Sequence, residues 1–342
     1  VLLFASGSTF FTRSVSVKML PFDDKNEIQV IVDMPEGTAL ETTVALASDI
    51  GRALVAVDEV ADIQLYAGVA APVNFNGMIR HYYLRRGPNI ADLQINLVDK
   101  GERDAQSHEV AIALRQIVQD IVAASGTGAN AKVVEVPPGP PVMSTLVAEI
   151  YGDDRSERER VAQEVMKSFE AHPSVVDVDW SLSAPQEEVR LEVDTEKAAL
   201  SGVSKEHVVG ALALALSGQV VSQLAAPAAR TPVPLRVTLS EGDRSGPARL
   251  GRLHVMSNTG EMIPSSELLE VRTTTRAQVV DRKNGKPVVY VMAEVAGDEE
   301  SPVYAILDLE KELDIIEVGE GEPLGRLFAR QPQVTERPVL KW

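Results

Sequence analysis

Cysteine is missing from the 342 residues, and aromatic residues make up only 4% of them. The absence of cysteine excludes a disulfide scaffold, thiol catalysis and a cysteine-ligated zinc site, and it leaves the redox compartment open. With 7 Phe, 6 Tyr and 2 Trp, the chain has too few rings for a base-stacking surface. The hydrophobic cores must therefore be built from Val, Leu, Ile and Ala.

Positive charge is also scarce, because 33 Lys and Arg stand against 50 Asp and Glu, a formal net charge of −17. Such a surface repels phosphate backbones, so we expect no nucleic-acid partner. Hydrophobic residues make up 44% of the chain and charged residues 24%, which is ordinary for a folded protein. At about 100–200 residues per domain, the length predicts two or three domains.

Motifs for catalysis and for cofactor binding are absent as well. The five histidines are dispersed, and there is no H-E-x-x-H, nucleophile elbow or Walker loop. Gly126–Ala131 fits G-x-G-x-x-A, but it follows a predicted helix and precedes a strand, which predicts a helix C-cap and turn. Asp177 and Asp179 alternate along a predicted strand, so we expect them on a solvated face. The sequence therefore predicts neither an enzyme nor a cofactor.

The first 140 residues predict strand–helix–strand twice. Thr38 and Glu41 fit a capping box at the start of the first helix, the stretch Gly68–Asn89 reads as a loop, and Pro137–Pro141 reads as a stiff linker. This order is that of a split βαβ, ferredoxin-like sandwich. The periodicity of apolar residues predicts strands at 27–34, 61–67, 92–98 and 131–136 and helices at 40–57 and 104–124.

The same pattern begins again after the linker, but an insertion interrupts it. Ser204 is expected to cap a helix within the insertion, and Lys283–Lys286 reads as a hairpin turn that leads back into the parent domain. The expected fold class is α+β: two ferredoxin-like βαβ sandwiches, the second interrupted by a small α+β module. The second sandwich is expected to contain strands at 146–151, 175–180, 287–295 and 338–342 and helices ending near 171 and 313.

The chain opens with a short apolar run, Val1–Phe11. A membrane-spanning helix needs about 20 such residues, so this run cannot cross a bilayer by itself. It fits a buried strand or ordered tail, or else the last turns of a transmembrane helix. At the other end, Pro338–Trp342 has no stop signal after it, and we expect both ends to be cuts through a longer polypeptide.

Two groups of residues are candidates for ligand binding. Met34 and Met143 each lie where a predicted element meets the expected cleft, and thioether sulfur suits Cu(I) or Ag(I), although methionine also fills gaps in cores. The Gly68–Asn89 loop suits ligand handling, or it packs locally. Its apolar and aromatic candidates are Phe75, Met78, Tyr82 and Tyr83.

Several segments, in the right order along nearly the whole chain, resemble the second large periplasmic loop of resistance–nodulation–division (RND) efflux permeases of the acriflavine-resistance and heavy-metal type. They are VSVKMLPFDDKNEIQVIVDMPEGTALETT at 15–43, APVNFNGMIRHYYLRRGPNIADLQINLVDK at 71–100, PPGPPVMSTLVAEIYG at 137–152, RLEVDTEKAALSGVSKEHVVGALALALSG at 190–218 and GEMIPSSELLEV at 260–271.

The resemblance implies a division into subdomains. Residues 1–14 would be the end of a transmembrane helix and a linker, and 15–140 the first porter subdomain. The second porter subdomain would comprise 141–187 and 284–342, with a docking subdomain at 188–283 inserted in it. Within that insertion, the apolar segment Gly218–Pro232 is expected to be an arm that contacts a neighbouring protomer.

The function implied by the resemblance is transport. Such permeases are proton-driven homotrimers of the bacterial inner membrane, and this portion would lie on the periplasmic face. It would bind a drug-like or hydrophobic compound or a metal ion and relay it toward an outer-membrane channel. The implied partners are neighbouring protomers, a periplasmic adaptor, the channel and, through transmembrane helices outside this chain, the membrane. The proton-relay residues also belong to those helices.

The resemblance also implies site residues. In the heavy-metal branch three methionines of this loop hold Cu(I) or Ag(I); Met34 and Met143 fall on two of those positions, and Ile90 occupies the third. The drug-exporting branch lines its pocket with phenylalanines, whose nearest equivalents here are Phe75, Met78, Tyr82 and Tyr83. A rival interpretation is a soluble regulatory protein that binds a small metabolite through ACT-like ferredoxin sandwiches.

Overall fold

The computed structural model describes Thr9, Thr12 and residues 23–72, 74–80, 82–136, 143–225, 229–297 and 300–342. The chain divides into two compact units, Val1–Ala184 with Gln278–Trp342, and Pro185–Ala277. The predicted transmembrane end at 1–14, apart from Thr9 and Thr12, and the predicted linker Pro137–Pro141 lie outside the described residues. No helix within the described part of the chain has the length and apolar character needed to span a membrane.

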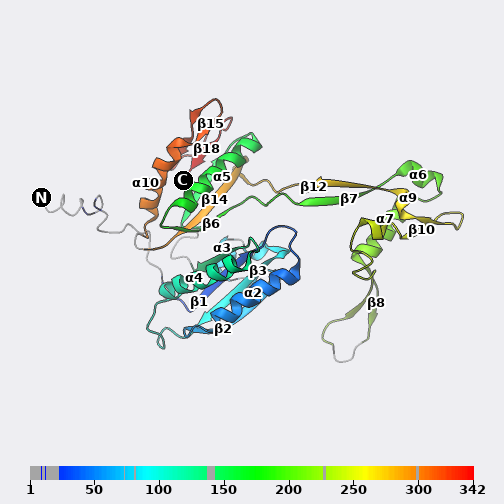
Figure 1. Ribbon diagram of the computed structural model, residues 1–342, viewed down its shortest axis with the longest axis horizontal. Helices are drawn as coiled ribbons and strands as arrows, with labels where there is room; N and C mark the ends of the chain where they lie inside the picture. Colours follow the sequence, from blue (N-terminus) through cyan, green and yellow to red (C-terminus); the bar gives the residue numbers. More distant parts are fainter. Residues whose placement is uncertain are drawn as a thin grey trace. The chain divides into compact units, whose positions relative to one another are not determined.

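The first sandwich lies in the first unit and has the predicted order of elements (Figure 1). Its four strands form an antiparallel sheet in the order β2-β3-β1-β4, so each helix connects two strands that are not neighbours. The prediction of strand–helix–strand twice is confirmed. The elements are β1 (Glu27–Asp33), α2 (Leu40–Leu54), β2 (Val60–Val69), β3 (Arg86–Leu97), α4 (Ser107–Ser125) and β4 (Asn130–Glu135).

The second sandwich, in the same unit, repeats this strand order as β6-β14-β5-β18. The short strand β17 (Gly325–Leu327) adds to β18 in parallel. The turn Asn284–Gly285 has left-handed φ values of 53° and 78°, as a tight hairpin turn requires, so that prediction is confirmed. The main elements are β5 (Leu146–Tyr151), α5 (Arg155–Ala171), β6 (Val175–Trp180), β14 (Lys286–Val295), α10 (Pro302–Glu312) and β18 (Val339–Lys341).

The minor elements in the described part of this unit are α3 (Phe75–Arg80), η1 (Tyr82–Leu84), β13 (Arg282–Lys283), η2 (Leu313–Ile315), β15 (Glu317–Val318) and β16 (Glu322–Pro323).

Alternating apolar residues fix which face of each sheet its helices cover. In the first sandwich, Val30 and Val32 of β1 pack with Ile50 of α2 and Leu114 of α4, all fully buried. In the second, the core contains Phe169, whose ring stacks on that of Trp342 with centroids 6.0 Å apart. Both cores consist mainly of Val, Leu, Ile and Ala, as the composition predicts, and each belongs to one sandwich.

Two local predictions are wrong. The N-cap of α2 is Ala39 and makes no side-chain cap bond, because the Thr38 hydroxyl donates instead to the Pro35 carbonyl oxygen at 2.6 Å. The stretch Gly68–Asn89 is not a plain loop, since it contains α3, η1 and the start of β3. The side chain of Asn74 caps the start of α3 by accepting a hydrogen bond from the Gly77 N–H at 2.7 Å. Asparagine is a common N-cap residue, but this cap was not predicted from the sequence.

The second unit is built on a long antiparallel pair, β7 (Glu187–Val193) with β12 (Leu269–Thr275). Ser204 caps α7 (Lys205–Ser217) by accepting from the His207 N–H at 3.2 Å, which confirms that prediction. Val208 and Leu268 are fully buried in its small core. The remaining elements are α6 (Thr195–Leu200), β8 (Gln219–Leu224), β9 (Val233–Val237), α8 (Pro247–Leu250), β10 (His254–Met256), β11 (Met262–Pro264) and α9 (Ser265–Leu268).

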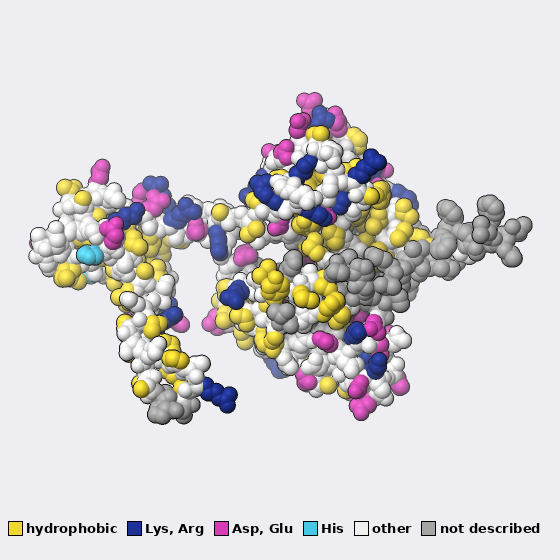
Figure 2. Space-filling view, turned by 180° about the vertical axis from the view of Figure 1, so that it is seen from behind, with side chains coloured by type: hydrophobic (Ala, Val, Ile, Leu, Met, Phe, Trp, Pro, Cys, Tyr) yellow, Lys and Arg dark blue, Asp and Glu magenta, His cyan; other side chains and the backbone are white. Residues whose placement is uncertain are grey.

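Every residue of the two strands of the hairpin β8–β9 is exposed, and apolar side chains line them (Figure 2). It includes most of the predicted arm Gly218–Pro232, of which residues 226–228 lie outside the described residues.

Candidate functional site

A cavity of about 330 Å³ lies in the first unit, with walls from both sandwiches. The first sandwich contributes β4, α3 and η1, and the second contributes β6, β14 and the residues beside them. Met143 and Ser144 come from the segment that leads into β5. The lining residues carry both signs of charge, two phenol rings and two thioethers. They include Arg80, Tyr82, Lys132, Met143, Asp177, Asp179, Tyr290, Met292 and Glu294.

Asp177 and Asp179 do not lie on a solvated face, so that prediction is wrong. The register of β6 against β14 shifts between Met292 and Glu294, and Asp177 has a left-handed φ of 53°. This bulge breaks the simple alternation from which the exposed face was inferred. The side chain of Asp177 is 3% exposed and faces the first sandwich, where it accepts from the Arg115 guanidinium Nε at 3.0 Å.

Among the described residues, four ion pairs join the sandwiches, and their charges are segregated. In these four pairs the first sandwich contributes the cationic partner and the second contributes the carboxylate. The pairs are Arg80–Glu294 at 2.7 Å, Arg115–Asp177 at 3.0 Å, His108–Glu300 at 2.5 Å, and Lys132–Asp179.

Lys132 pairs with carboxylates on both sides of this boundary. It pairs with Asp179 across the boundary and with Asp33 of its own sandwich at 3.3 Å. Burial alone would lower the pKa of Lys132, but the two carboxylates more than offset it and hold the pKa above its usual range. Burial raises the pKa of Asp177, although Arg115 opposes that shift. Lys132 therefore stays charged while buried.

A charge network extends from this lysine into the first sandwich. Asp33 also pairs with Arg85, and Arg85 pairs with the fully buried Asp92 at 2.5 Å. The Arg85 guanidinium lies 5.7 Å from the centre of the Tyr82 ring, within cation–π range. The network thus connects the Tyr82 segment to the boundary between the sandwiches.

Two buried polar atoms in the cavity lining have no hydrogen-bond partner among the described residues, Arg80 Nε and Asp177 Oδ1. Leaving such an atom unpaired costs about 1–3 kcal/mol. One is a donor and the other an acceptor, so a bound polar molecule or water can satisfy either. No group of three or more His, Asp or Glu side chains within the described ranges is arranged to hold a metal ion.

The structure brings together only some of the residues predicted to bind substrate. Tyr82 and Met143 line the cavity. Met34 is 4% exposed and packs in the core of the first sandwich, so its sulfur does not face the cavity. Phe75, Met78 and Tyr83 lie on exposed surface of α3 and η1 and are not among the lining residues.

Lys132, Arg80 and Glu294 of the cavity lining were not predicted from the sequence. Lys132 stands within the mostly apolar strand A-K-V-V-E-V, and a lysine on such a strand is the signal that could have pointed to it. Arg80 and Glu294 pair with each other across 214 positions of sequence, so the residues around each of them gave no signal of the pair.

A family model described as the AcrB/AcrD/AcrF family matches residues 1–317. The nickel and cobalt resistance protein CnrA of Cupriavidus metallidurans is 27% identical over 161 residues, which is 46% of this chain and 15% of CnrA. Two crystal forms of a heavy metal efflux pump share the fold, with TM-scores of 0.69 and 0.70 over 90% and 91% of this chain. Their sequence identities are 17% and 18%, and the chain covers 31% and 32% of theirs.

Proposed function

Because the chain belongs to the AcrB/AcrD/AcrF family of RND efflux permeases, we propose that its cavity takes up the substrate that the permease exports. The main support for this proposal is a cavity whose walls come from two separate sandwiches. In its lining, one buried donor and one buried acceptor have no hydrogen-bond partner among the described residues. Family membership argues against the rival interpretation, a soluble metabolite-binding regulator.

The subdomain boundaries form part of the proposal. Residues 15–140 are the first porter subdomain, 141–187 with 284–342 the second, and 188–283 the docking subdomain. The similarity of the described fold to a heavy metal efflux pump supports an efflux portion of this kind. The chain spans about 15% of the length of CnrA, so the activity of the whole permease belongs to the proposal.

The cavity suits a substrate with an apolar body and a polar or charged group. Tyr82 and Tyr290 offer ring faces, Met143 and Met292 offer polarisable sulfur, and Arg80 offers the unpaired donor. A drug-like compound meets this description, and the thioethers also suit a soft metal ion. The names of the relatives, which refer to nickel, cobalt and heavy metals, favour a metal ion.

The proposal rests on Tyr82 and Met143 among the residues predicted to bind substrate. Met34, Phe75, Met78 and Tyr83 stay predictions. A metal site shared by Met34 and Met143 requires the Met34 sulfur to leave its core, because that side chain is only 4% exposed.

Segregated charge at the boundary supports relay by relative movement of the two porter subdomains. Both faces of such a boundary hydrate well when they separate, and the apolar cores stay closed. Rigid sandwiches that tilt against each other fit the hinge and shear motions of domain closure. Substrate entry would separate Lys132 from Asp179 and leave Lys132 paired with Asp33 alone.

The assembly, location and partners of the permease are proposed from its family membership. The complete permease would be a proton-driven homotrimer, with this portion at the periplasmic face of the bacterial inner membrane. Its partners would be neighbouring protomers, a periplasmic adaptor and an outer-membrane channel. The exposed apolar hairpin β8–β9 is the segment that we propose contacts a neighbouring protomer.

Binding to the isolated chain tests the cavity directly. Rhodamine 6G binding would be followed by fluorescence anisotropy, and Ag(I) and Ni²⁺ binding by calorimetry. We expect Tyr82→Ala and Met143→Ala to weaken binding of at least one probe by about tenfold or more, the equivalent of 1.4 kcal/mol. Tyr83→Ala is the matched control, because Tyr83 is a neighbouring tyrosine outside the cavity lining. Equal affinities for all three variants and the unaltered chain would refute the cavity assignment.

A further inference from the structure

The short hairpin β10–β11 in the second unit has one buried and one exposed face. Its register pairs His254 with Pro264, Val255 with Ile263 and Met256 with Met262. Val255 is 5% exposed and packs in the core of the unit, and Ile263 packs against the same core. Because side chains alternate along a strand, the other two pairs point away from that core.

Met256 and Met262 are directly opposite each other on the outer face. Their exposed fractions are 62% and 57%, whereas methionine is usually found inside a protein. Side chains directly opposite in an antiparallel pair have Cβ atoms about 4.5–5.5 Å apart. Two flexible thioethers at that spacing can reach one ion between them, and neither sulfur is needed to fill the core.

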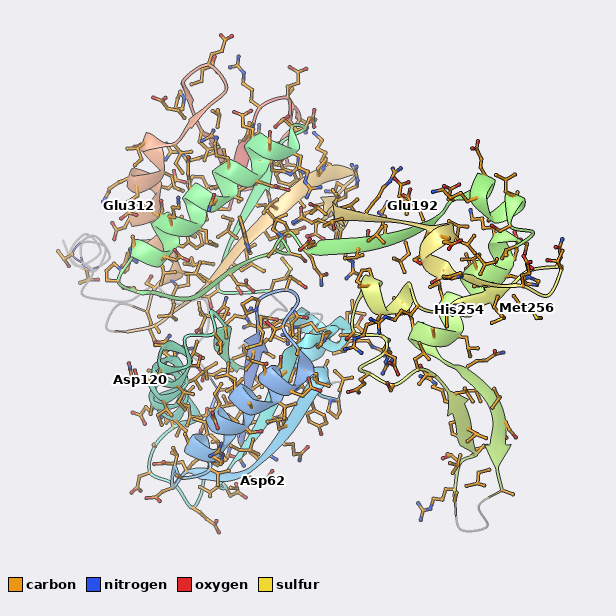
Figure 3. The ribbon with its side chains drawn as sticks, turned by 45° about the vertical axis from the view of Figure 1, so that its right-hand side comes forward. Asp62, Asp120, Glu192, His254, Met256 and Glu312 are labelled. Atoms are coloured by element: carbon orange, nitrogen blue, oxygen red, sulfur yellow. The ribbon has the colours of Figure 1, made fainter. Side chains whose placement is uncertain are left out.

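His254 adds a nitrogen donor to the same face. It stands two residues before Met256 on β10, and Figure 3 shows the two residues on this one short strand. Its ring makes no hydrogen bond or ion pair with any other residue in the described part of the chain, and it is exposed. A neutral imidazole has a free lone pair for a metal ion.

We propose that His254, Met256 and Met262 form a binding site for a soft monovalent cation, Cu(I) or Ag(I). Thioether sulfur selects soft ions, and imidazole is a common ligand of copper. The three donors are neutral and do not compensate the charge of a bound ion. On an open surface this costs less binding free energy for a monovalent ion than for a divalent one. These three donors do not include the carboxylates or further imidazoles that Ni²⁺, Co²⁺ and Zn²⁺ prefer.

This site is independent of the cavity. It shares no residue with the cavity lining, and it belongs to the other compact unit. Its donors lie on open surface, so a bound ion can exchange with solvent or with another protein. The site therefore offers the second unit a way to receive or pass on a soft metal ion, whatever the cavity binds.

Methionine-methyl NMR tests the proposal, because the chain has only 8 Met and each signal can be assigned by substitution. The intact 342-residue chain, labelled with methyl-¹³C methionine, would be titrated with Ag(I). We expect the Met256 and Met262 signals to shift together and to saturate at one equivalent. Met256→Leu should remove the shift of Met262 and lower the affinity at this site at least tenfold, and His254→Gln should lower it several-fold.

Met78→Leu is the control, since Met78 is similarly exposed, at 55%, but does not belong to this hairpin. It should leave the site unchanged. If Met256 and Met262 shift no more than Met78 does, or if Met262 still shifts fully in Met256→Leu, the site does not exist. The Met143 and Met292 signals report the cavity separately, so failure of either site is visible without the other.

Discussion

The interior of each sandwich and the boundary between the two sandwiches are held together by different forces. The interiors contain Val, Leu, Ile and Ala with a few rings such as Phe169, nearly all excluded from solvent. In the described part of the chain, the boundary is joined by four ion pairs whose cations come from one side and whose carboxylates come from the other. Both regions lie within one compact unit of one chain, and they differ in how they respond to water.

Separating an apolar interior in water is costly, because each buried Å² of apolar surface contributes about 25 cal/mol to stability. Separating an ion pair costs much less, since both charges regain hydration that they had lost on burial. The contrast indicates that each sandwich moves as a rigid body and that the boundary opens. A substrate cavity at such a boundary can fill and empty without unfolding either core.

The largest effect is expected in an interior. Phe169 is fully buried and stacks on Trp342, so Phe169→Ala should lower the free energy of unfolding by about 3–5 kcal/mol. Urea unfolding followed by circular dichroism would measure it. Phe75→Ala provides the comparison, because Phe75 is 45% exposed and should cost no more than about 0.5 kcal/mol. Equal losses for the two would contradict the assignment of the core.

At the boundary, removal of one charge should cost less than the loss of a core ring. Lys132→Met leaves Asp33 and Asp179 without their shared cation, and we expect a loss of about 1–3 kcal/mol in the same unfolding assay. Adding Asp179→Asn should recover part of that loss, since the double variant no longer holds an unpaired carboxylate there. Strictly additive losses would show that Lys132 and Asp179 are not coupled.

The ion pair between His108 and Glu300 should make the stability of the boundary sensitive to alkaline pH. The hydrogen bonds that the His108 ring donates to Glu135 and then to Glu300 raise the pKa of His108 from 6.5 to about 9, while burial opposes them. A raised histidine pKa gives stability that is fully present below pH 6.5 and disappears as the pH rises through about 9. Other charged groups near this histidine are Arg80, Arg115 and Glu294.

We therefore expect the melting temperature of the unaltered chain to fall between pH 6.5 and 9.5 by about 2–4 °C more than that of His108→Gln. Differential scanning calorimetry at several pH values would measure this difference. Parallel pH profiles for the two proteins would show that charged His108 does not stabilise the boundary.

The smallest effect is expected on the exposed hairpin, which belongs to neither region. Val221 of β8 is 54% exposed, so Val221→Lys should change the unfolding free energy by less than about 0.5 kcal/mol. If the hairpin contacts a neighbouring protomer, the same substitution should weaken trimer formation by the full-length permease, which sedimentation would detect. A large loss of stability in the isolated chain would mean that the hairpin packs within its own unit.

Local signals account for the parts of the fold that the sequence predicted well. The strand Leu146–Tyr151 and the cap at Ser204 depend on neighbouring residues, so periodicity and capping rules suffice for them. The Thr38 capping box failed because the same hydroxyl has a competing acceptor, the carbonyl of Pro35, in the preceding turn. Rules of this kind cannot rank two local partners of similar strength.

The site was harder to predict because it depends on contacts between distant segments. Tyr82 and Met143 were found through their chemistry and through resemblance to a family. Asp177 was misplaced because a bulge changes its direction and another sandwich covers it, and neither event leaves a trace in the local pattern. Met34 carries suitable chemistry, but this residue, which directly follows β1, is buried in the core of the first sandwich.

Movement of the boundary is the central claim, and a distance between the two sandwiches tests it most directly. The chain has no cysteine, so Gln119→Cys on α4 and Glu170→Cys on α5, both exposed, give one spin label on each sandwich. Double electron–electron resonance would compare the labelled chain alone, with saturating Ag(I) or rhodamine 6G, and with Lys132→Met. The account predicts a longer or broader distance distribution with the bound probe and with Lys132→Met. An unchanged narrow distribution in all three samples would contradict it.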